Sequence, residues 1–154
     1  AHIEKEFNNF KKSWEKYKKI IILGNGGSNA VASHISQDYV KFHIKKSLIF
    51  SDPSMLTCFI NDFGMEYAYS KFIEFHADKD TLCILMSSAG ESPNIINCII
   101  FCEKHNIPYG LLTGFNSKNK ARSISKNALW NYYIESNSYG IVECIHQIFL
   151  HAVV

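Results

Sequence analysis

The segment IIILGNGGS at residues 20–28 decides the fold class of this chain. Its first four residues form an unbroken apolar run rich in β-branched side chains, which is typical of a strand buried on both faces of a parallel sheet. The glycines that follow permit positive φ angles and let a ligand approach the backbone closely. Ser28 stands where the N-cap of a helix is expected, and the free amides at a helix start attract anions. The segment therefore predicts a buried strand, a Gly-rich turn and a helix.

The Gly-rich turn matches neither of two common nucleotide-binding motifs. Position 29 is Asn where G-x-G-x-x-G has its last glycine, and no G-K-[ST] sequence follows as it does in a Walker A loop. By itself, the turn therefore fits a purely structural role as well as it fits anion binding.

Similar apolar runs recur along the chain and alternate with segments of helical spacing. Strands are expected at 20–23, 47–50, 82–86, 109–112 and 129–134, and helices at about 3–17, 28–43, 66–77, 93–105, 118–126 and 139–152. This alternation predicts an α/β domain with a parallel sheet and right-handed crossovers. We expect a three-layer αβα sandwich with a five-stranded, flavodoxin-like sheet. One domain is expected over residues 1–154, with an N-terminal helix in 1–17 and the α/β core in 18–154.

The amino-acid composition and net charge exclude several classes of protein. The chain has 154 residues, of which 47% are hydrophobic and 19% charged, so a packed domain is expected and disorder is excluded. The formal net charge is only +2, and the lysines of 11–19 are interleaved with glutamates, so we interpret them as a solvated helix face and expect no nucleic-acid partner. With no apolar stretch of transmembrane length and no signal-peptide pattern, we expect a cytoplasmic protein without a membrane partner.

The five cysteines form no C-x-x-C pair, and most sit in apolar runs. They are interpreted as reduced, buried thiols of a cytosolic protein. Cys98 and Cys102 share a helix face, where core packing is favoured over a metal pair.

Ligands of open parallel sheets bind beyond the carboxyl ends of the strands. After the third expected strand, residues 87–94 read SSAGESPN, in which three hydroxyls and a glycine precede a Pro early in a helix. This is a chemically suitable phosphate cradle without lysine or arginine, provided that Glu91 turns outward. Thr113 adds a hydroxyl after the fourth strand, and NDFG at 61–64 fits an Asx-turn.

Two expected helices carry acidic residues and histidines on shared faces. His34 and Asp38 are four residues apart, so they differ by about 40° around the helix. Glu143 and His151 are eight apart on the last helix, about 80° of offset, and can point into one cleft. His146 lies between them. A single histidine of this kind is more often a satisfied core residue, whereas the paired arrangement favours a functional site.

Together these features resemble the sugar isomerase (SIS) domain family, and within it the phosphoheptose isomerases. The resemblance extends from about Ile20 to His151. The motifs that carry it are GNGGS at 24–28 with His34, NDFG at 61–64, SSAGESPN at 87–94, LTG at 112–114 and the segment from Glu143 to His151. Each motif is modest, but their order and spacing together are specific.

The resemblance implies a five-stranded SIS fold, a homo-oligomer (tetramer or dimer) with active sites at subunit interfaces, and no organic cofactor. It implies isomerisation of sedoheptulose 7-phosphate to D-glycero-D-manno-heptose 7-phosphate, which supplies heptose for lipopolysaccharide or capsule. Asp38 and His151 correspond to the catalytic carboxylate and histidine of the family. Substrate-binding positions correspond to Asn25, Gly26, Ser28, Asp62, Ser87, Ser88, Ser92 and Thr113. Some members hold zinc through side chains that correspond to His34, Asp38, Glu143 and His151.

The chain departs from the family pattern at several of these positions. Asp38 replaces the usual Glu and is shorter by one methylene, roughly 1.5 Å of reach. Glu143 replaces the usual Gln and adds negative charge, which together with Asp38 favours a divalent cation or, if no metal is bound, raises the pKa of one of the two carboxyl groups. Ala89 replaces a serine of the phosphate loop, Glu91 an asparagine, and Gly140 an aspartate.

These departures keep two alternatives open beside a phosphoheptose isomerase. One is a non-catalytic SIS module that senses a phosphosugar or binds a protein such as the replication initiator DnaA. The other is an isomerase of a different ketose phosphate in the same fold.

Overall fold

The computed structural model describes residues 2–154, so Ala1 of the expected domain lies outside it. Over this range the chain forms seven helices and five strands. In chain order they are α1 His2–Lys16, β1 Lys19–Leu23, α2 Gly27–His43, β2 Lys46–Ile49, α3 Pro53–Phe63, α4 Met65–His76, β3 Thr81–Ser87, α5 Pro93–His105, β4 Tyr109–Thr113, α6 Lys120–Ile124, β5 Asn131–Tyr133 and α7 Tyr139–His151.

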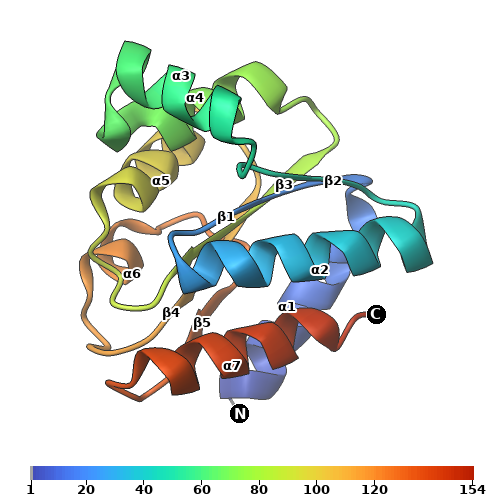
Figure 1. Cartoon of the computed structure of the whole chain (residues 1–154). Helices are drawn as coiled ribbons and strands as arrows, with labels where there is room; N and C mark the ends of the chain where they lie inside the picture. The colour runs from blue at the N-terminus through green and yellow to red at the C-terminus, as the bar shows by residue number, and fades with distance from the viewer. Residues whose placement is uncertain (1) are drawn as a thin grey trace.

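The five strands form one parallel sheet in the order β2-β1-β3-β4-β5, which confirms the expected flavodoxin-like topology. Helices α1, α2 and α7 cover one face of the sheet, and α3 to α6 lie on the other (Figure 1). Alternate residues of each strand face opposite layers, so Ile20 and Ile22 pack in the first core while Ile21 and Leu23 pack in the second. The three-layer αβα sandwich is therefore confirmed.

Helix α3 was not expected from the sequence. Its start is nevertheless encoded, because Asp52 accepts a hydrogen bond from the Met55 amide at 2.9 Å and Pro53 occupies the first turn. The turn expected at 61–64 is wrong for its first three residues, which are the last residues of α3. Gly64, with φ of 83°, separates α3 from α4, a conformation that favours glycine. None of the α3 residues is fully buried, which explains its weak apolar pattern.

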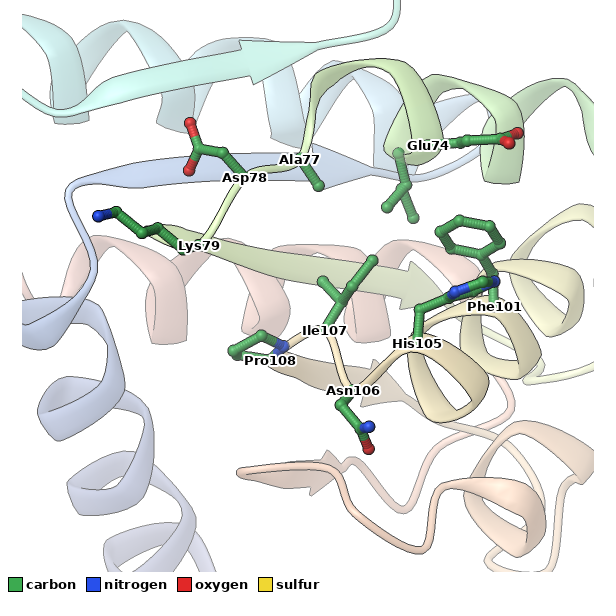
Figure 2. A pocket seen from close by; sticks show the side chains of 10 residues that line it. Glu74, Ala77, Asp78, Lys79, Phe101, His105, Asn106, Ile107 and Pro108 are labelled. Carbon is green, nitrogen blue, oxygen red and sulfur yellow. The ribbon is translucent and has the colours of Figure 1, made fainter.

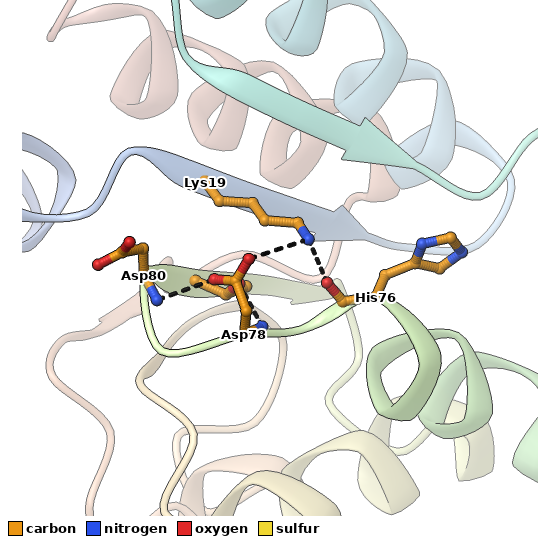
Figure 3. Close-up of polar contacts among 5 residues, drawn as sticks. Lys19, His76, Asp78 and Asp80 are labelled. Carbon is orange, nitrogen blue, oxygen red and sulfur yellow. Dashed lines mark hydrogen bonds and ion pairs between the residues drawn. The ribbon is translucent and has the colours of Figure 1, made fainter.

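A polar network fixes the amino-terminal edge of the sheet (Figure 3). Lys19 Nζ donates to the carbonyl of His76 at the end of α4 and lies 3.4 Å from Asp78 Oδ2. The Asp80 amide donates to Asp78 Oδ1 at 2.8 Å, and this bond together with the Thr81 hydroxyl and Lys19 lowers the pKa of Asp78. These contacts hold the start of β1 beside the start of β3.

The cysteines only partly follow the sequence interpretation. Cys83, Cys98 and Cys102 are buried in the core, and burial raises the pKa of Cys98 well above its usual value. Cys58 and Cys144 are exposed, so the expectation of buried thiols is wrong for these two. All five are free thiols, and none of the helices described between residues 2 and 154 has the length and apolarity to cross a membrane.

Replacing Gly110 with alanine is expected to lower the free energy of unfolding by about 1–3 kcal/mol or more. A Cβ at this position in β4 would lie 1.9 Å from Cε2 of Trp130, a ring that is only 1% exposed and cannot move aside. Urea unfolding of the variant measures the loss. The control is Gly140→Ala in α7, where a Cβ meets no atom within 4 Å among the described residues and where alanine favours the helix. Equal stability of the two variants would contradict this account of the sheet.

Candidate active site

A cavity of about 100 Å³ lies where the carboxyl ends of β1 and β3 meet the start of α7. The Gly-rich turn contributes Asn25 and Ser28 to it. The cavity is lined by Asn25, Ser28, Met86, Ser87, Ser88, Ala89, Ser92, Tyr139 and Glu143. The structure thus brings together five of the residues that the sequence predicted for substrate binding, at the edge of the sheet where ligands are expected.

The segment 87–92, called the phosphate loop below, is shaped by its own hydroxyls. Ser87 Oγ accepts a hydrogen bond from the Gly90 amide at 3.1 Å and lies 3.3 Å from Ser92 Oγ. Gly90 has φ of 73°, which lets the chain reverse before α5 begins. The loop therefore presents serine hydroxyls and the amino end of α5 to the cavity, a combination that suits an anion.

The two loops that flank the cavity are tied together by an amide pair. Asn25 Nδ2 donates to Asn94 Oδ1 at 2.9 Å, and Asn94 Nδ2 donates back to Asn25 Oδ1 at 2.8 Å. This reciprocal contact joins the Gly-rich turn to the first turn of α5. It fixes the two segments relative to one another.

Glu91 turns away from the cavity, as an anion site requires. Its Oε1 accepts a hydrogen bond from the Lys120 amide at 3.2 Å, at the start of α6. The carboxylate lies near the positive end of that helix rather than beside the expected phosphate.

Ser88 and Thr113 carry buried hydroxyls without a hydrogen-bond partner among residues 2–154. Ser88 lines the cavity, whereas Thr113 is fully buried at the end of β4 and is not among the cavity-lining residues. Buried hydroxyls are normally paired, so an unpaired one in a cavity marks a place where a ligand atom can bind.

A second group of polar side chains lies between α2 and α7, which run side by side (Figure 1). Asp38 Oδ2 is 3.6 Å from His151 Nδ1, and both side chains are partly buried. The rings of His34 and His151 meet edge to face with centroids 5.1 Å apart. One ligand atom from each of these three residues lies within 4.8 Å of the others. This group, called the α2–α7 cluster below, can hold a metal ion or transfer protons.

Glu143, expected as a fourth member, lies outside the α2–α7 cluster in the described chain. Its carboxylate sits over the start of α2, where a Cβ on Gly27 would be 2.1 Å from Oε2 of Glu143, and it lines the cavity of the phosphate loop. The eight residues that separate Glu143 from His151 span about 12 Å of helix, which explains the separation. The structure thus assembles three of the four side chains named for the metal.

Two other predicted residues lie apart from the cavity of the phosphate loop. Asp62 is exposed on α3, where Cys58 Sγ lies 3.6 Å from its Oδ2 and Asn61 donates to its Oδ1 at 3.1 Å. Gly26 lines a separate cavity of about 610 Å³ that also includes Met65 and Glu66. Asn25 and Ser92 line both cavities, so the two are neighbours.

His146 is a buried histidine on α7, between Glu143 and His151. It is 1% exposed, and its Nε2 lies 2.9 Å from the carbonyl oxygen of Thr113. Desolvation lowers its pKa to about 4, against the smaller opposing effect of that hydrogen bond. Helical spacing alone did not separate His146 from His151, and only the family resemblance assigned the functional role to His151.

Acid is therefore expected to destabilise the protein through His146. The folded state has a pKa of about 4 for this group and the unfolded state about 6.5, so between these values only the unfolded state binds the proton. The free energy of unfolding should fall by about 3 kcal/mol as pH drops through this window, and the loss stops below it. Urea unfolding at about pH 7 and about pH 4.5 of wild type and His146→Gln isolates the contribution, because other titrating groups are common to both proteins. An identical pH dependence of the two would contradict it.

A cavity at the opposite edge of the sheet has different chemistry (Figure 2). It measures about 530 Å³ and lies before β3 and β4, beside the ends of α4 and α5. Glu74, Asp78, Lys79 and His105 line it together with apolar residues such as Phe101. It contains none of the residues predicted for substrate or metal.

Comparisons with known proteins find relatives in sequence and in fold. No protein-family model matches the chain. The chain is 31% identical over 145 residues to a phosphoheptose isomerase of Fusobacterium nucleatum, and the alignment covers 90% of the chain and 72% of that protein. It is 33% identical over 107 residues to a phosphoheptose isomerase of Glaesserella parasuis, where the alignment covers 66% of the chain and 56% of the relative.

Solved structures agree in fold. A phosphoheptose isomerase from Neisseria gonorrhoeae superposes with a TM-score of 0.86 at 21% identity, covering 97% of this chain and 83% of that one. One from Francisella tularensis superposes with a TM-score of 0.85 at 17% identity, covering 99% and 82%. At these identities the superpositions establish a shared fold.

Proposed function

The chain belongs to the phosphoheptose isomerase family of aldose–ketose isomerases, and on that premise we propose that it interconverts sedoheptulose 7-phosphate and D-glycero-D-manno-heptose 7-phosphate, with Asp38 and His151 as the acid–base pair. The observation that carries the proposal is the placement of these two side chains. They come from different helices, α2 and α7, and lie 3.6 Å apart.

The chemistry requires two proton-transferring groups. Aldose–ketose isomerisation moves a proton between C1 and C2 of the open-chain sugar through an enediol, while the neighbouring oxygen gains and loses a proton. The Asp38 carboxylate and the His151 imidazole suit these two tasks. At 3.6 Å, Asp38 Oδ2 and His151 Nδ1 are within ion-pair distance when the histidine is protonated.

The phosphate of the substrate is assigned to the phosphate loop. The hydroxyls of Ser87, Ser88 and Ser92 and the first amides of α5 supply donors there. No lysine or arginine is among the residues that line this cavity within 2–154, so hydrogen bonds and the helix dipole carry the anion.

A zinc ion fits the α2–α7 cluster by its donor set. Catalytic zinc sites commonly use three protein ligands drawn from histidine and carboxylate and keep one position open. His34, Asp38 and His151 offer two imidazoles and one carboxylate within 4.8 Å of one another. Zinc bound there would polarise the substrate carbonyl and stabilise negative charge on its oxygen. It would also occupy Asp38 and His151, so the acid–base role of these two side chains applies to the protein without zinc.

We expect zinc to bind the purified protein and to raise its melting temperature. Replacing His34 with alanine removes one of three ligands and should weaken zinc binding by at least about 10-fold, since each ligand contributes directly to the site. Calorimetric titration of zinc into wild type and variant measures this. His105→Ala, at the opposite edge of the sheet, is the control. Unchanged affinity in His34→Ala would remove the α2–α7 cluster as the binding site.

The direct test of the proposed function is conversion of sedoheptulose 7-phosphate to the aldose, followed with and without zinc. Turnover of this sugar in preference to other ketose phosphates supports the proposal. Turnover of another ketose phosphate alone would establish the different isomerase, and phosphosugar binding without any turnover would establish the sensing module.

We also propose a homo-oligomer assembled through α7. An apolar stripe runs along the exposed side of this helix, where Ile141 is 54% and Ile148 67% exposed with Cys144 between them. Residues spaced by three and four form a continuous stripe on one helix face, which suits helix–helix packing between subunits. Light scattering of wild type and Ile148→Glu tests it, and a wild-type monomer would overturn it.

Free thiols support a cytoplasmic location. All five cysteines are unpaired with one another, as is usual in a reducing compartment. We therefore propose that the reaction takes place in the cytoplasm, and fractionation of cells that express the protein tests this.

A further inference from the structure

His146 makes a specific contact at the carboxyl end of β4. Its Nε2 lies 2.9 Å from the Thr113 carbonyl oxygen, which can only accept, so Nε2 carries the proton and donates. Nδ1 is then an acceptor, and it is buried with no hydrogen-bond partner within the part of the chain from His2 to Val154. The imidazole is thus fixed in one tautomer by its contact with the sheet.

The contact continues into the phosphate loop. Thr113 is followed by Gly114, whose amide donates to the Ser88 carbonyl at 2.7 Å. Two hydrogen bonds and one peptide unit therefore connect α7 to the loop. The helix also packs directly on this junction, because a Cβ on Gly114 would lie 2.7 Å from Cγ2 of Val142.

Core packing alone does not account for a histidine at this position. The side chain is 1% exposed, and an apolar residue of similar volume would bury the same area without an unpaired acceptor. Burying an unpaired polar group destabilises a fold. What only the histidine supplies is a directed bond from α7 to the end of β4.

The helix held by this bond carries functional side chains on both sides of His146. Glu143 lies three residues before it and faces the cavity of the phosphate loop, and His151 lies five residues after it in the α2–α7 cluster. A shift of α7 along the sheet would therefore change the distance from His151 to a sugar whose phosphate is held by the loop.

We propose that His146 is a positioning residue that fixes α7 against the phosphate loop, and so sets the reach of His151 to the substrate. This inference rests on the proposed isomerase function for its catalytic readout. In structural terms, two hydrogen bonds in series connect α7 to the phosphate loop. They are the His146–Thr113 bond and the Gly114–Ser88 bond.

The experiment compares three variants of the full chain. His146→Leu removes the donor with an apolar side chain, and Thr113 keeps its second donor, the Ile134 amide at 3.1 Å. His146→Gln keeps an N–H donor at a similar position. Phe149→Leu, in the aromatic core on the same helix, serves as a control for stability without contact to the loop.

We expect His146→Leu to lower kcat by about 10- to 100-fold, because a displacement near 1 Å has that effect on rate. The affinity for inorganic phosphate, measured by calorimetry, should stay within about 3-fold, since the loop itself remains on β3. His146→Gln should restore most of kcat, and Phe149→Leu should keep it. An unchanged kcat in His146→Leu, or an equal loss in Phe149→Leu, would overturn the proposal.

Hydrogen exchange of the Gly114 amide gives a readout that does not depend on turnover. Faster exchange in His146→Leu and wild-type exchange in His146→Gln support the connection, and equal protection in all proteins contradicts it. If wild type fails to convert the sugar but Gly114 exchange responds as expected, the proposed function fails while the connection between α7 and the loop stands.

Discussion

Replacing His151 with asparagine is expected to lower kcat for sedoheptulose 7-phosphate by about 10²- to 10⁴-fold, the usual contribution of a general acid–base group. The substitution keeps a polar side chain of similar width but removes the imidazole, which can both accept and donate a proton. Asp38→Asn should have a comparable effect, because an amide of the same shape cannot act as a base. Steady-state kinetics at saturating substrate measures both losses.

A double variant that combines Asp38→Asn with His151→Asn tests whether the two residues act together. If Asp38 and His151 act as one proton-transferring unit, the double variant loses no more than the worse single variant, since the unit is already broken. His105→Asn, at the opposite edge of the sheet, should keep wild-type kcat and is the matched histidine control. A variant at position 151 that retains more than about a third of kcat would remove His151 from the acid–base role.

The second large effect is expected at Ser88, where alanine should weaken binding of substrate and of inorganic phosphate by about 10- to 100-fold. The Ser88 hydroxyl is buried in the cavity wall and lacks a partner among the described residues, so it is available to donate to a phosphate oxygen. A hydrogen bond to a charged group contributes about 1.5–3 kcal/mol, which corresponds to this range of affinity.

The same substitution should stabilise the ligand-free protein by about 1 kcal/mol, because it removes an unpaired buried polar group. The opposite signs of the two effects make the prediction specific. Thr113→Val is the matched control: it removes another buried, unpaired hydroxyl that is not among the cavity-lining residues, so it should stabilise the protein without weakening phosphate binding. Melting curves and phosphate titrations of both variants measure this. Loss of stability in Ser88→Ala, or unchanged phosphate affinity, would contradict it.

Much of the fold could be predicted because its elements are locally encoded. The run at 20–23 is apolar on both sides of the strand, and β1 is found at Lys19–Leu23. The start of α5 follows from Pro93, which sits in the first turn as expected. Helix α3 was missed because its residues stay partly exposed, so its apolar period is weak although Asp52 and Pro53 mark its start.

The candidate site also has one part that the sequence could predict and one part that it could not. Ser87, Ser88 and Ser92 could be assigned to one loop because they are close in sequence and follow a strand. The pairing of Asp38 with His151 could be expected only through resemblance to a family, since 113 positions separate them in the printed sequence. Helical spacing gave the face of each side chain but not the distance between the helices.

The sequence by itself determined the five strands, six of the seven helices, the Gly-rich turn and the phosphate loop, because each depends on side chains within a few residues of one another. Only the tertiary structure decided that Glu143 faces the phosphate loop and not the α2–α7 cluster, and that His146 bonds to Thr113. It also decided that Thr113 is fully buried and is not among the residues that line the cavity. The physical reason is that these outcomes depend on how α7 slides and rotates against the sheet. Packing between elements that are distant in sequence fixes that position, and no local pattern encodes it.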